Sequence, residues 1–461
     1  MNMIDKQNTA HALIVLSLIP AMAFGAGNKK KTEHTDKPNV IIVLTDDQGK
    51  GDLGCLGNPL IKTPNIDKFY SQSVSLNNFH VSPTSAPSRA ALMTGRFTNR
   101  TNCFHTVGGR DNVYEDEIMM PQIFSENGYC TAMFGKWHLG DNYPCRPQDK
   151  GFQEVVKHGG GGIGQTPDYW GNDYFDDVYS HNGKNQQYKG YCTDVFFHEA
   201  INYIELHKNE PFFCYLALNA PHAPHNVPQN YYELYRNTKI NDDVKRFYGM
   251  ITNIDDNFKL LEDKLKELGI YDNTIIIFMT DNGTAGGYGV NNGGMRGMKN
   301  SEYEGGHCVP FFIRWNKGNL NGGKKIDNLC AHIDLLPTFV EMCNLNFTPT
   351  KPIDGISIMP LLYGEKGKFD NRHLITDSQR LQNLVKWRKS AVMTQRWRLV
   401  NGSELYDMRS DKMQKSDISK RYPQTVDSLR SDYETWWKSI KTRIQIPIIH
   451  IFGLGPLSKT L

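Results

Sequence analysis

The chain has 461 residues, of which 39% are hydrophobic and 11% aromatic, a composition that fits one large globular domain and a smaller one. Its 52 basic and 49 acidic residues give a formal net charge of +3, so composition implies no general affinity for nucleic acid. The nine cysteines include no Cys-x-x-Cys pair and indicate neither a disulfide framework nor a zinc cluster.

The N-terminus carries an apolar stretch from Ala12 to Phe24, in which Ala21 and Ala23 offer small residues for cleavage. The stretch is shorter than the ~20 residues that a membrane helix needs, and its length is typical of a secretory signal. We therefore predict a signal peptide over residues 1–26, no membrane span, and an exported protein that works in the periplasm or outside the cell.

Four continuous apolar runs further along the chain each stop at polar side chains. Runs of this length separated by helical segments predict parallel strands in an α/β sheet. Because ligands of such sheets bind at the carboxyl ends of the strands, we expect the four polar groups to converge on one site. The runs are 39–45, which ends at Asp46 and Asp47; 129–134, before Lys136 and His138; 212–218, before His222; and 273–280, which ends at Asp281 and Asn282.

Residues 85–96 form the most specific pattern in the chain. Taken alone, Ser85 and Pro87 predict a helix with Ser85 as its N-cap, a place that also favours an anion. The run also resembles the signature of type I sulfatases, Cys or Ser-x-Pro-Ser-Arg-x-x-Leu-x-Thr-Gly-Arg, at every specified position. In that family the first residue is oxidised to formylglycine, whose hydrate is the nucleophile and then expels sulfate with its second hydroxyl.

The resemblance implies the alkaline phosphatase-like fold. This is an α/β fold in which helices sandwich a large mixed, mostly parallel sheet, with a small C-terminal subdomain of antiparallel sheet plus helix. A serine at position 85 implies that an anaerobic radical-type sulfatase-maturating enzyme performs the oxidation, and hence a bacterial host. A sulfated carbohydrate is the substrate that the resemblance suggests.

Asp46, Asp47, Asp281 and Asn282 offer only oxygen ligands, which suit Ca²⁺ or Mg²⁺ and not zinc. Either pair alone is also typical of a turn that ends a strand. Two such pairs at matching strand ends, in a chain that also holds the Ser85 signature, favour one divalent cation, with Ca²⁺ ahead of Mg²⁺. The resemblance implies that an oxygen of the modified Ser85 completes this metal site.

The resemblance also assigns roles to five further residues. Lys136 and Lys299 bind sulfate oxygens, Arg89 steadies the diol, His138 handles the diol proton, and His222 donates to the leaving oxygen. Lysine, arginine and histidine fit these tasks because cleavage of the S–O bond gathers negative charge. The matching motifs are Gly-Lys-Trp-His-Leu-Gly at 135–140, Ala-Pro-His at 220–222 and Tyr-Glu-Gly-Gly at 303–306.

One position departs from the family pattern. Cys308 stands where the family commonly has an arginine. Loss of that cation either alters the loop that holds Lys299 or is compensated nearby, for example by His307 or Arg314.

The segment from 151 to 190 is rich in glycine, asparagine and aromatic residues, and a long irregular loop of this kind is often functional. Trp170 and Asp173 are therefore candidates for binding a substrate sugar. Packing of the loop onto the domain is an equally good explanation of these side chains.

The pattern changes after Asp354. Residues 391–400, Asn401-Gly402 and 403–408 predict a hairpin, and a polar helix is expected at 426–441. We therefore divide the chain into the signal peptide, a catalytic domain over 36–354 and a C-terminal subdomain over 355–461.

The leading hypothesis is an exported sulfuric ester hydrolase that acts on sulfated glycans. The alternatives are a phosphodiesterase or phosphonate monoester hydrolase of the same superfamily, and a sulfated-glycan binder without activity. The binder would follow if Ser85 were never oxidised or if Cys308 crippled the site. A two-zinc phosphatase is disfavoured because the sequence offers no evident candidates for its extra His and Asp ligands.

Overall fold

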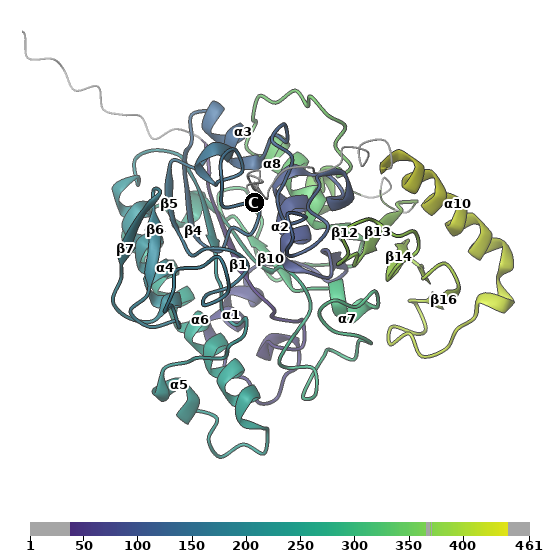
Figure 1. Cartoon of the computed structure of the whole chain (residues 1–461), viewed down its shortest axis with the longest axis horizontal. Helices are drawn as coiled ribbons and strands as arrows, with labels where there is room; N and C mark the ends of the chain where they lie inside the picture. The colour runs from purple at the N-terminus through teal and green to yellow at the C-terminus, as the bar shows by residue number, and fades with distance from the viewer. Residues whose placement is uncertain (1–36, 366–368, 370, 441–461) are drawn as a thin grey trace, which may run out of the picture. The chain divides into compact units, whose positions relative to one another are not determined.

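The computed structural model describes residues 37–365, 369 and 371–440, and the predicted signal peptide lies outside them. Within this part of the chain, ten strands pair in one sheet (Figure 1). In spatial order they are β11 (Lys325–Ile326), β2 (Val74–Leu76), β10 (Phe311–Arg314), β9 (Thr274–Thr280), β1 (Asn39–Thr45), β8 (Phe212–Ala217), β4 (Cys130–Gly135), β5 (Glu154–Lys157), β6 (Val178–His181) and β7 (Lys184–Gln187).

The centre of the sheet, β9-β1-β8-β4-β5, is parallel throughout. Antiparallel pairs lie on both sides of it, at β9–β10 and at β5–β6. All four predicted apolar runs form neighbouring central strands, and β1, β8 and β9 are buried along their whole length because both faces are covered. The predicted α/β fold with a mixed, mostly parallel sheet is confirmed.

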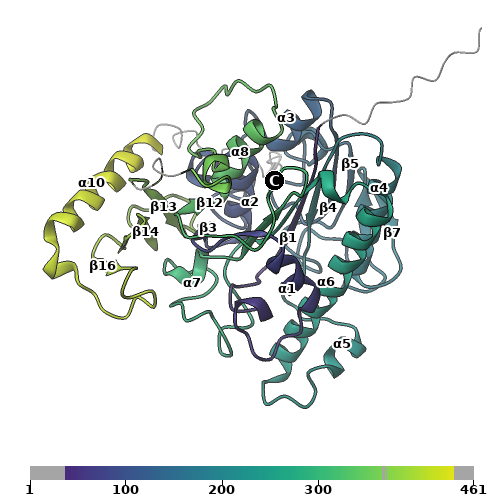
Figure 2. The same cartoon turned by 180° about the vertical axis from the view of Figure 1, so that it is seen from behind.

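Helices cover the two faces of this sheet (Figures 1 and 2). Alternate residues of β1 point to opposite sides. Ile41 and Val43 pack with α1 (Pro64–Ser71), α4 (Cys192–Leu206) and α6 (Asp242–Glu267). Val40 and Ile42 pack with α2 (Ser85–Thr94), α3 (Met120–Glu126) and α8 (Leu335–Met342). No helix of the described residues is long and apolar enough to cross a membrane.

Short elements complete this part of the structure. β3 (Phe79–His80) pairs in parallel with β12 (Cys330–Ala331) at the side of the main sheet. The remaining short helices are α5 (Gln229–Glu233), α7 (Glu304–His307) and α9 (Met359–Leu362).

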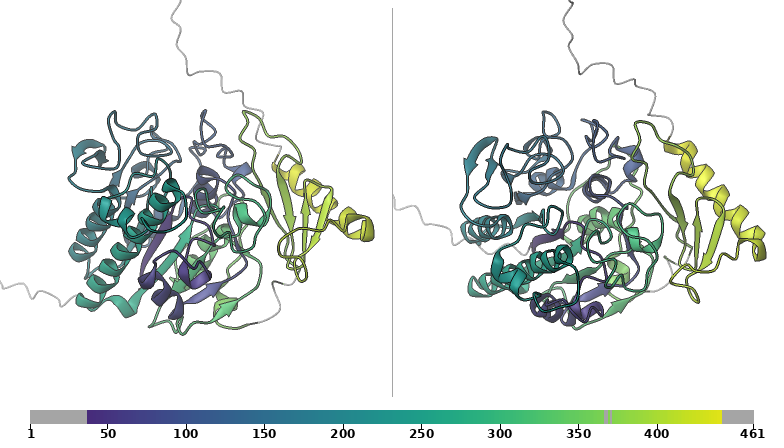
Figure 3. Two further views of the ribbon diagram at one scale, coloured as in Figure 1. Left: turned by 90° about the horizontal axis from the view of Figure 1, so that it is seen from below. Right: turned by 60° about the horizontal axis from the view of Figure 1, so that its bottom comes forward.

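A second, antiparallel sheet is built by the last part of the described chain (Figure 3). Its strands are β13 (Leu374–Asp377), β14 (Ser390–Met393), β15 (Trp397–Val400) and β16 (Glu404–Asp407), and α10 (Pro423–Ile440) packs on it. The predicted turn at Asn401-Gly402 joins β15 to β16, and both residues have the positive φ of a type I′ turn, 51° and 69°. The predicted first arm, 391–400, was wrong as one strand, because it folds back on itself and forms both β14 and β15.

Candidate active site

Polar side chains from four neighbouring strands meet at the carboxyl edge of the main sheet. Asp46 and Asp47 follow β1, Asp281 and Asn282 follow β9, and Lys136 follows β4. His222 follows β8 after a short loop. Because β9, β1, β8 and β4 are adjacent and parallel, residues far apart in the sequence are brought together here.

Ser85 lies against this group at the start of α2. The residue in the N-cap position is Thr84, with extended φ and ψ of −146° and 155°, so the prediction that Ser85 is the N-cap was wrong by one residue. The Ser85 hydroxyl is free of the capping role and lies 3.1 Å from Asp46 Oδ1 and 3.2 Å from Asn282 Oδ1. Ser85 is only 2% exposed.

Three buried carboxylates face three cationic side chains in the site. Arg89 Nη2 lies 2.8 Å from Asp281 Oδ2. The Lys136 ammonium contacts Asp46 Oδ2, and Lys299 Nζ lies 2.7 Å from Asp47 Oδ1. Positive and negative charges of this kind must be paired, because an isolated ion so far from water is strongly disfavoured.

The carboxyl groups respond differently to this environment. Burial alone would raise the pKa of Asp46, but Lys136, His222 and Arg89 together outweigh it and the pKa lies below its usual value. Burial and the neighbouring charge of Asp46 raise the pKa of Asp281, against Arg89 and Lys136. A further cation beside Asp281 would favour its charged form.

The donor set fits a hard divalent cation. Asp46, Asp47, Asp281 and Asn282 are between 0 and 2% exposed and present only oxygen ligands at short range. Asn282 Nδ2 lies 2.8 Å from Asp47 Oδ1, and the Asp47 amide donates to Asp281 Oδ1 over 3.2 Å. Ligand atoms of Asp46, Asp47 and His222 all lie within 4.8 Å of one another.

Two histidines border the same place. His138 Nε2 donates to the Thr106 carbonyl over 2.9 Å, and its buried Nδ1 has no hydrogen-bond partner among the described residues. His222 Nδ1 donates to the Ala223 carbonyl over 2.7 Å, which leaves Nε2, 3.8 Å from Asp47 Oδ2, available for proton exchange. Burial lowers the pKa of both rings.

A cavity of about 460 Å³ opens above these groups, and we call it the active-site cavity. Ser85, Lys136, His138, His222 and Lys299 line it. Its other walls come from loops whose residues the sequence did not single out, because loops carry no periodic pattern. They include Asp111 and Asn112, Asp141 and Asn142, Gln165 to Pro167, and Arg380 from the loop after β13.

Trp170 and Asp173 do not line this cavity. The Trp170 side chain is 96% exposed, and Asp173 Oδ1 accepts a hydrogen bond from the Phe175 amide within its own loop. The same loop instead brings Gln165, Thr166 and Pro167 to the cavity. A substrate role for Trp170 and Asp173 stays a prediction.

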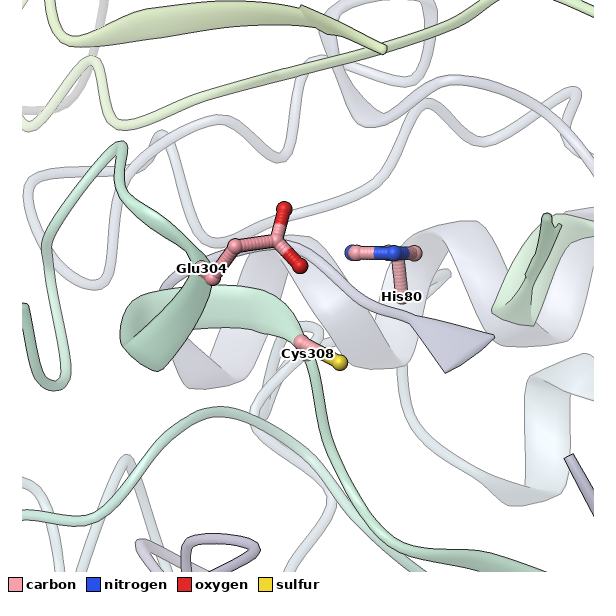
Figure 4. Close-up of side chains that lie close together, drawn as sticks. All are labelled: His80, Glu304 and Cys308. Carbon is pink, nitrogen blue, oxygen red and sulfur yellow. The ribbon is translucent and has the colours of Figure 1, made fainter. Parts of the chain in front are cut away.

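Cys308 lies in a buried polar cluster with His80 and Glu304 (Figure 4). Ligand atoms of these three residues lie within 4.8 Å of one another. Arg398 Nε pairs with Glu304 Oε1 at 2.5 Å, and Lys50 Nζ lies 3.8 Å from Cys308 Sγ. This cluster already holds two cationic side chains, which disfavours a metal ion there.

Neither of these two cations was among the compensating residues expected from the sequence. Of those, Arg314 lies 3.8 Å from Glu262 instead. His307 Nδ1 lies 2.9 Å from His80 Nδ1, beside the cluster, but burial lowers its pKa, so the ring is not a cation at neutral pH. Two cationic side chains that are distant in sequence, Lys50 and Arg398, thus lie in the cluster around Cys308.

Buried carboxylates, a serine at a helix start and fixed cations at the carboxyl edge of a parallel sheet define a hydrolase of the alkaline phosphatase-like fold. Comparison with known families matches the Sulfatase family over residues 38–345. The chain therefore belongs to the sulfatase family, whose members hydrolyse sulfuric esters.

Relatives with known names agree with this assignment. The chain is 30% identical to the uncharacterized sulfatase YdeN of Escherichia coli, over 73% of this chain and 68% of that protein. It is 29% identical to human N-acetylgalactosamine-6-sulfatase, over 70% of this chain and 66% of that one. It thus spans about two thirds of the length of these relatives.

Solved structures give the same result. The crystal structure of Ps i-CgsB in complex with k-i-k-neocarrahexaose superposes with a TM-score of 0.79 at 30% identity, covering 87% of this chain and 92% of that one. A phosphonate monoester hydrolase of Agrobacterium radiobacter shares the fold at a TM-score of 0.62 and 18% identity, over 86% of this chain and 96% of that one.

Proposed function

We propose that this protein is an exported sulfatase that removes sulfate from sulfated glycans through a formylglycine made from Ser85. The observation that carries the proposal is the position of the Ser85 hydroxyl. It lies within 3.2 Å of oxygens of Asp46 and Asn282, at a cavity that Lys136 and Lys299 also line. The named relatives support a glycan substrate, since one is an N-acetylgalactosamine-6-sulfatase and another was solved with neocarrahexaose.

The residues around Ser85 have the chemistry that sulfate transfer requires. Lys136 and Lys299 hold the sulfate oxygens, and their fixed positive charge offsets the negative charge that grows as the S–O bond breaks. Arg89, which donates to the Lys136 carbonyl and pairs with Asp281, holds the start of α2 against the strand ends. A divalent cation held by Asp46, Asp47, Asp281, Asn282 and Ser85 would add Lewis-acid polarisation of a sulfate oxygen.

Proton transfer falls to the two histidines. Nε2 of His222 faces the cavity side of Asp47, whose negative charge favours the doubly protonated ring; in that form Nε2 gives its proton to the leaving oxygen and Nδ1 keeps the one bonded to the Ala223 carbonyl. His138 has its Nδ1 free of hydrogen bonds among the described residues, so it receives the proton of the modified Ser85. Both rings are held by backbone carbonyls, which fix the nitrogen that exchanges the proton.

The decisive experiment is mass spectrometry of the Ser85 peptide from protein made in an anaerobic host with a radical-type maturating enzyme. Oxidation of the serine to the aldehyde removes two hydrogens, and the peptide is lighter by that mass. Unmodified serine in such protein would instead favour a glycan binder without activity. Hydrolysis of an aryl sulfate compared with an aryl phosphodiester then separates a sulfatase from a phosphodiesterase or phosphonate monoester hydrolase.

Export is tested by the N-terminal sequence of the mature protein. We expect cleavage near residue 26 and recovery in the periplasm or the medium. An intact N-terminus in the cytoplasmic fraction would contradict it.

A further inference from the structure

A second cavity of about 500 Å³ adjoins the active-site cavity, and we call it the outer cavity. Asp141, Asn142 and Pro167 line both cavities, and we call these three residues the ridge. Each volume lies within the range of sites that bind small molecules. A ligand longer than one sugar ring can therefore cross the ridge and occupy both cavities.

The ridge is held rigidly. Asp141 Oδ2 accepts a hydrogen bond from the Gly160 amide over 2.8 Å, and Asp141 Oδ1 pairs with Lys157 Nζ at 2.5 Å. Asp168 follows Pro167 in the sequence, and its carboxylate accepts hydrogen bonds from the amides of Gly159 and Gly164, each over 2.9 Å. A preorganised surface of this kind binds without the free-energy loss of ordering a loop.

Two exposed tyrosines line the outer cavity. The Tyr143 side chain is 77% exposed and that of Tyr169 is 48% exposed, whereas most large hydrophobic side chains of the described chain are buried. Aromatic rings left in water beside a cavity offer flat apolar surfaces for a ligand, together with a hydroxyl for hydrogen bonding. Polar groups of Ser180 and Asn185 lie on the same walls.

The charges of the outer cavity are balanced. Lys157 pairs with Asp141, and Arg146 pairs with Asp149 at 2.8 Å. The active-site cavity contains Lys136 and Lys299, which pair with Asp46 and Asp47, and in addition Arg380, which has no ion pair among the described residues. Among the described residues that line the outer cavity, both cations, Lys157 and Arg146, are paired with a carboxylate, so a second sulfate is not favoured there. A neutral sugar ring has the apolar faces and hydroxyls that suit its walls.

We propose that the outer cavity is a subsite for an unsulfated sugar linked to the sulfated one, so that the substrate is an oligosaccharide or polysaccharide. This inference rests on the proposed function and deepens it. The sulfated sugar lies in the active-site cavity, and its neighbour crosses the ridge to contact Tyr143 and Tyr169. The predicted sugar-binding aromatics of the 151–190 loop then include Tyr169, next to the Trp170 named from the sequence.

The test uses the matured full-length enzyme and its Tyr143→Ala/Tyr169→Ala variant. Substrates are an aryl sulfate, sulfated monosaccharides, and tetrasaccharides of carrageenan, chondroitin sulfate and heparan sulfate. On the best tetrasaccharide we expect kcat/KM to fall about tenfold or more in the variant, through KM, because two aromatic contacts are lost. On the aryl sulfate, which fills only the active-site cavity, kcat/KM stays within twofold.

Tyr363→Ala is the matched control, because this tyrosine is 42% exposed and lines neither cavity. An equal loss on aryl sulfate and tetrasaccharide overturns the proposal, as does no loss on the tetrasaccharide. Higher kcat/KM for sulfated monosaccharides than for every tetrasaccharide overturns it as well.

Failure of the proposed function gives a different result, namely no hydrolysis of any sulfate ester by the matured wild type. The subsite is then judged by calorimetric titration of the Ser85→Ala protein with the desulfated tetrasaccharides. Binding that disappears in the double tyrosine variant supports the subsite, and binding that is absent or unchanged overturns it.

Discussion

The position of the Ser85 hydroxyl depends on where α2 begins: the N-cap is Thr84, and Ser85 is the first residue of the helix. Thr84 takes the extended backbone of the N-cap, so Ser85 enters the first turn and its side chain turns to the carboxylates that end β1 and β9. A serine in the N-cap position would direct its oxygen to the helix amides instead. The start of the helix at Ser85 therefore points this hydroxyl towards the carboxylates of the active site.

A divalent cation should stabilise the fold through these carboxylates. We expect Ca²⁺ to raise Tm, by an amount equivalent to about 2.7 kcal/mol when the ion is present at 100 times its Kd. Asp281→Asn should abolish this response, because it removes the carboxylate whose pKa is raised by burial and by Asp46. Thermal unfolding with and without Ca²⁺ measures it.

Asp52→Asn is the control for this prediction. Asp52 is equally buried and lies near the same strand end, but its carboxylate accepts from the Gly49 amide and is outside the oxygen cluster. Asp52→Asn should keep the Ca²⁺ response. A response retained in Asp281→Asn would show that the ion binds elsewhere.

The effect of replacing His222 on kcat should depend on whether the leaving group needs a proton. Without the proton from Nε2, kcat for an alkyl sulfate should fall about 10²- to 10⁴-fold in His222→Ala. For nitrophenyl sulfate, whose leaving oxygen needs no proton, the loss should be much smaller. His225→Ala, in the same loop but bonded to Asp243 and away from the cavity, should change neither rate. Equal losses on both esters would remove His222 from the acid role.

At this scale the sequence identified the residues that end strands or belong to strong motifs. Asp46, Asp47, Asp281 and Asn282 could be predicted to meet because parallel strands bring their carboxyl ends to one edge. Arg380 could not be predicted, because it reaches the cavity from a loop after β13, and only tertiary packing brings that loop to the site.

Among the elements, α7 is joined to the antiparallel sheet by one buried ion pair. Arg398 on β15 and Glu304 at the start of α7 are 1% and 6% exposed in their side chains. Burial alone would raise the pKa of Glu304, but Arg398, with smaller contributions from His80 and His307, outweighs it and brings the pKa to about 2. The pair therefore fixes the segment that follows Lys299 against the C-terminal sheet.

Arg398→Gln should destabilise the protein by about 3–5 kcal/mol, because it leaves a buried carboxylate without its partner. Arg396→Gln, two residues earlier, should cost about 1 kcal/mol or less, since its pair with Asp407 is partly exposed. Urea unfolding at pH 7 compares them. The contribution of the Arg398–Glu304 pair to the free energy of unfolding is fully present above pH 4.5. It is lost as pH falls towards 2, because the pKa of Glu304 is depressed in the folded state. Equal effects of the two substitutions would contradict the prediction.

The sequence predicted correctly the strands that are buried on both faces of the sheet. It failed at a turn that lacks the glycine, proline or asparagine typical of turns. The central strands are continuous apolar runs, the pattern typical of parallel strands that are buried on both faces. The turn between β14 and β15 carries no glycine or proline and is made by the Thr394 hydroxyl, which accepts from the Arg396 and Trp397 amides. No spacing in 391–400 signals that turn, whereas Asn401-Gly402 signals the next one.

For the molecule as a whole, the free energy of unfolding should decrease as pH falls, because His332 and His158 are buried in their uncharged form. Burial lowers the pKa of His332 to about 3 and that of His158 to about 4. His332 Nδ1 has no hydrogen-bond partner within the described residues, so a proton there would be left unsatisfied. Both rings become protonated near pH 6.5 when the chain unfolds.

The unfolded state thus binds more protons than the folded state between pH 3 and pH 6.5, and the free energy of unfolding decreases as pH falls through this window. His332→Gln should reduce the difference between pH 7 and pH 5 by about 2 kcal/mol, because the variant has no ring to protonate at this position. Urea unfolding at fixed Ca²⁺ concentration measures both values. His198→Gln, which replaces an exposed histidine on α4, is the control and should change the difference less than His332→Gln does. An acid slope identical in wild type and His332→Gln would mean that protonation of other groups destabilises the fold.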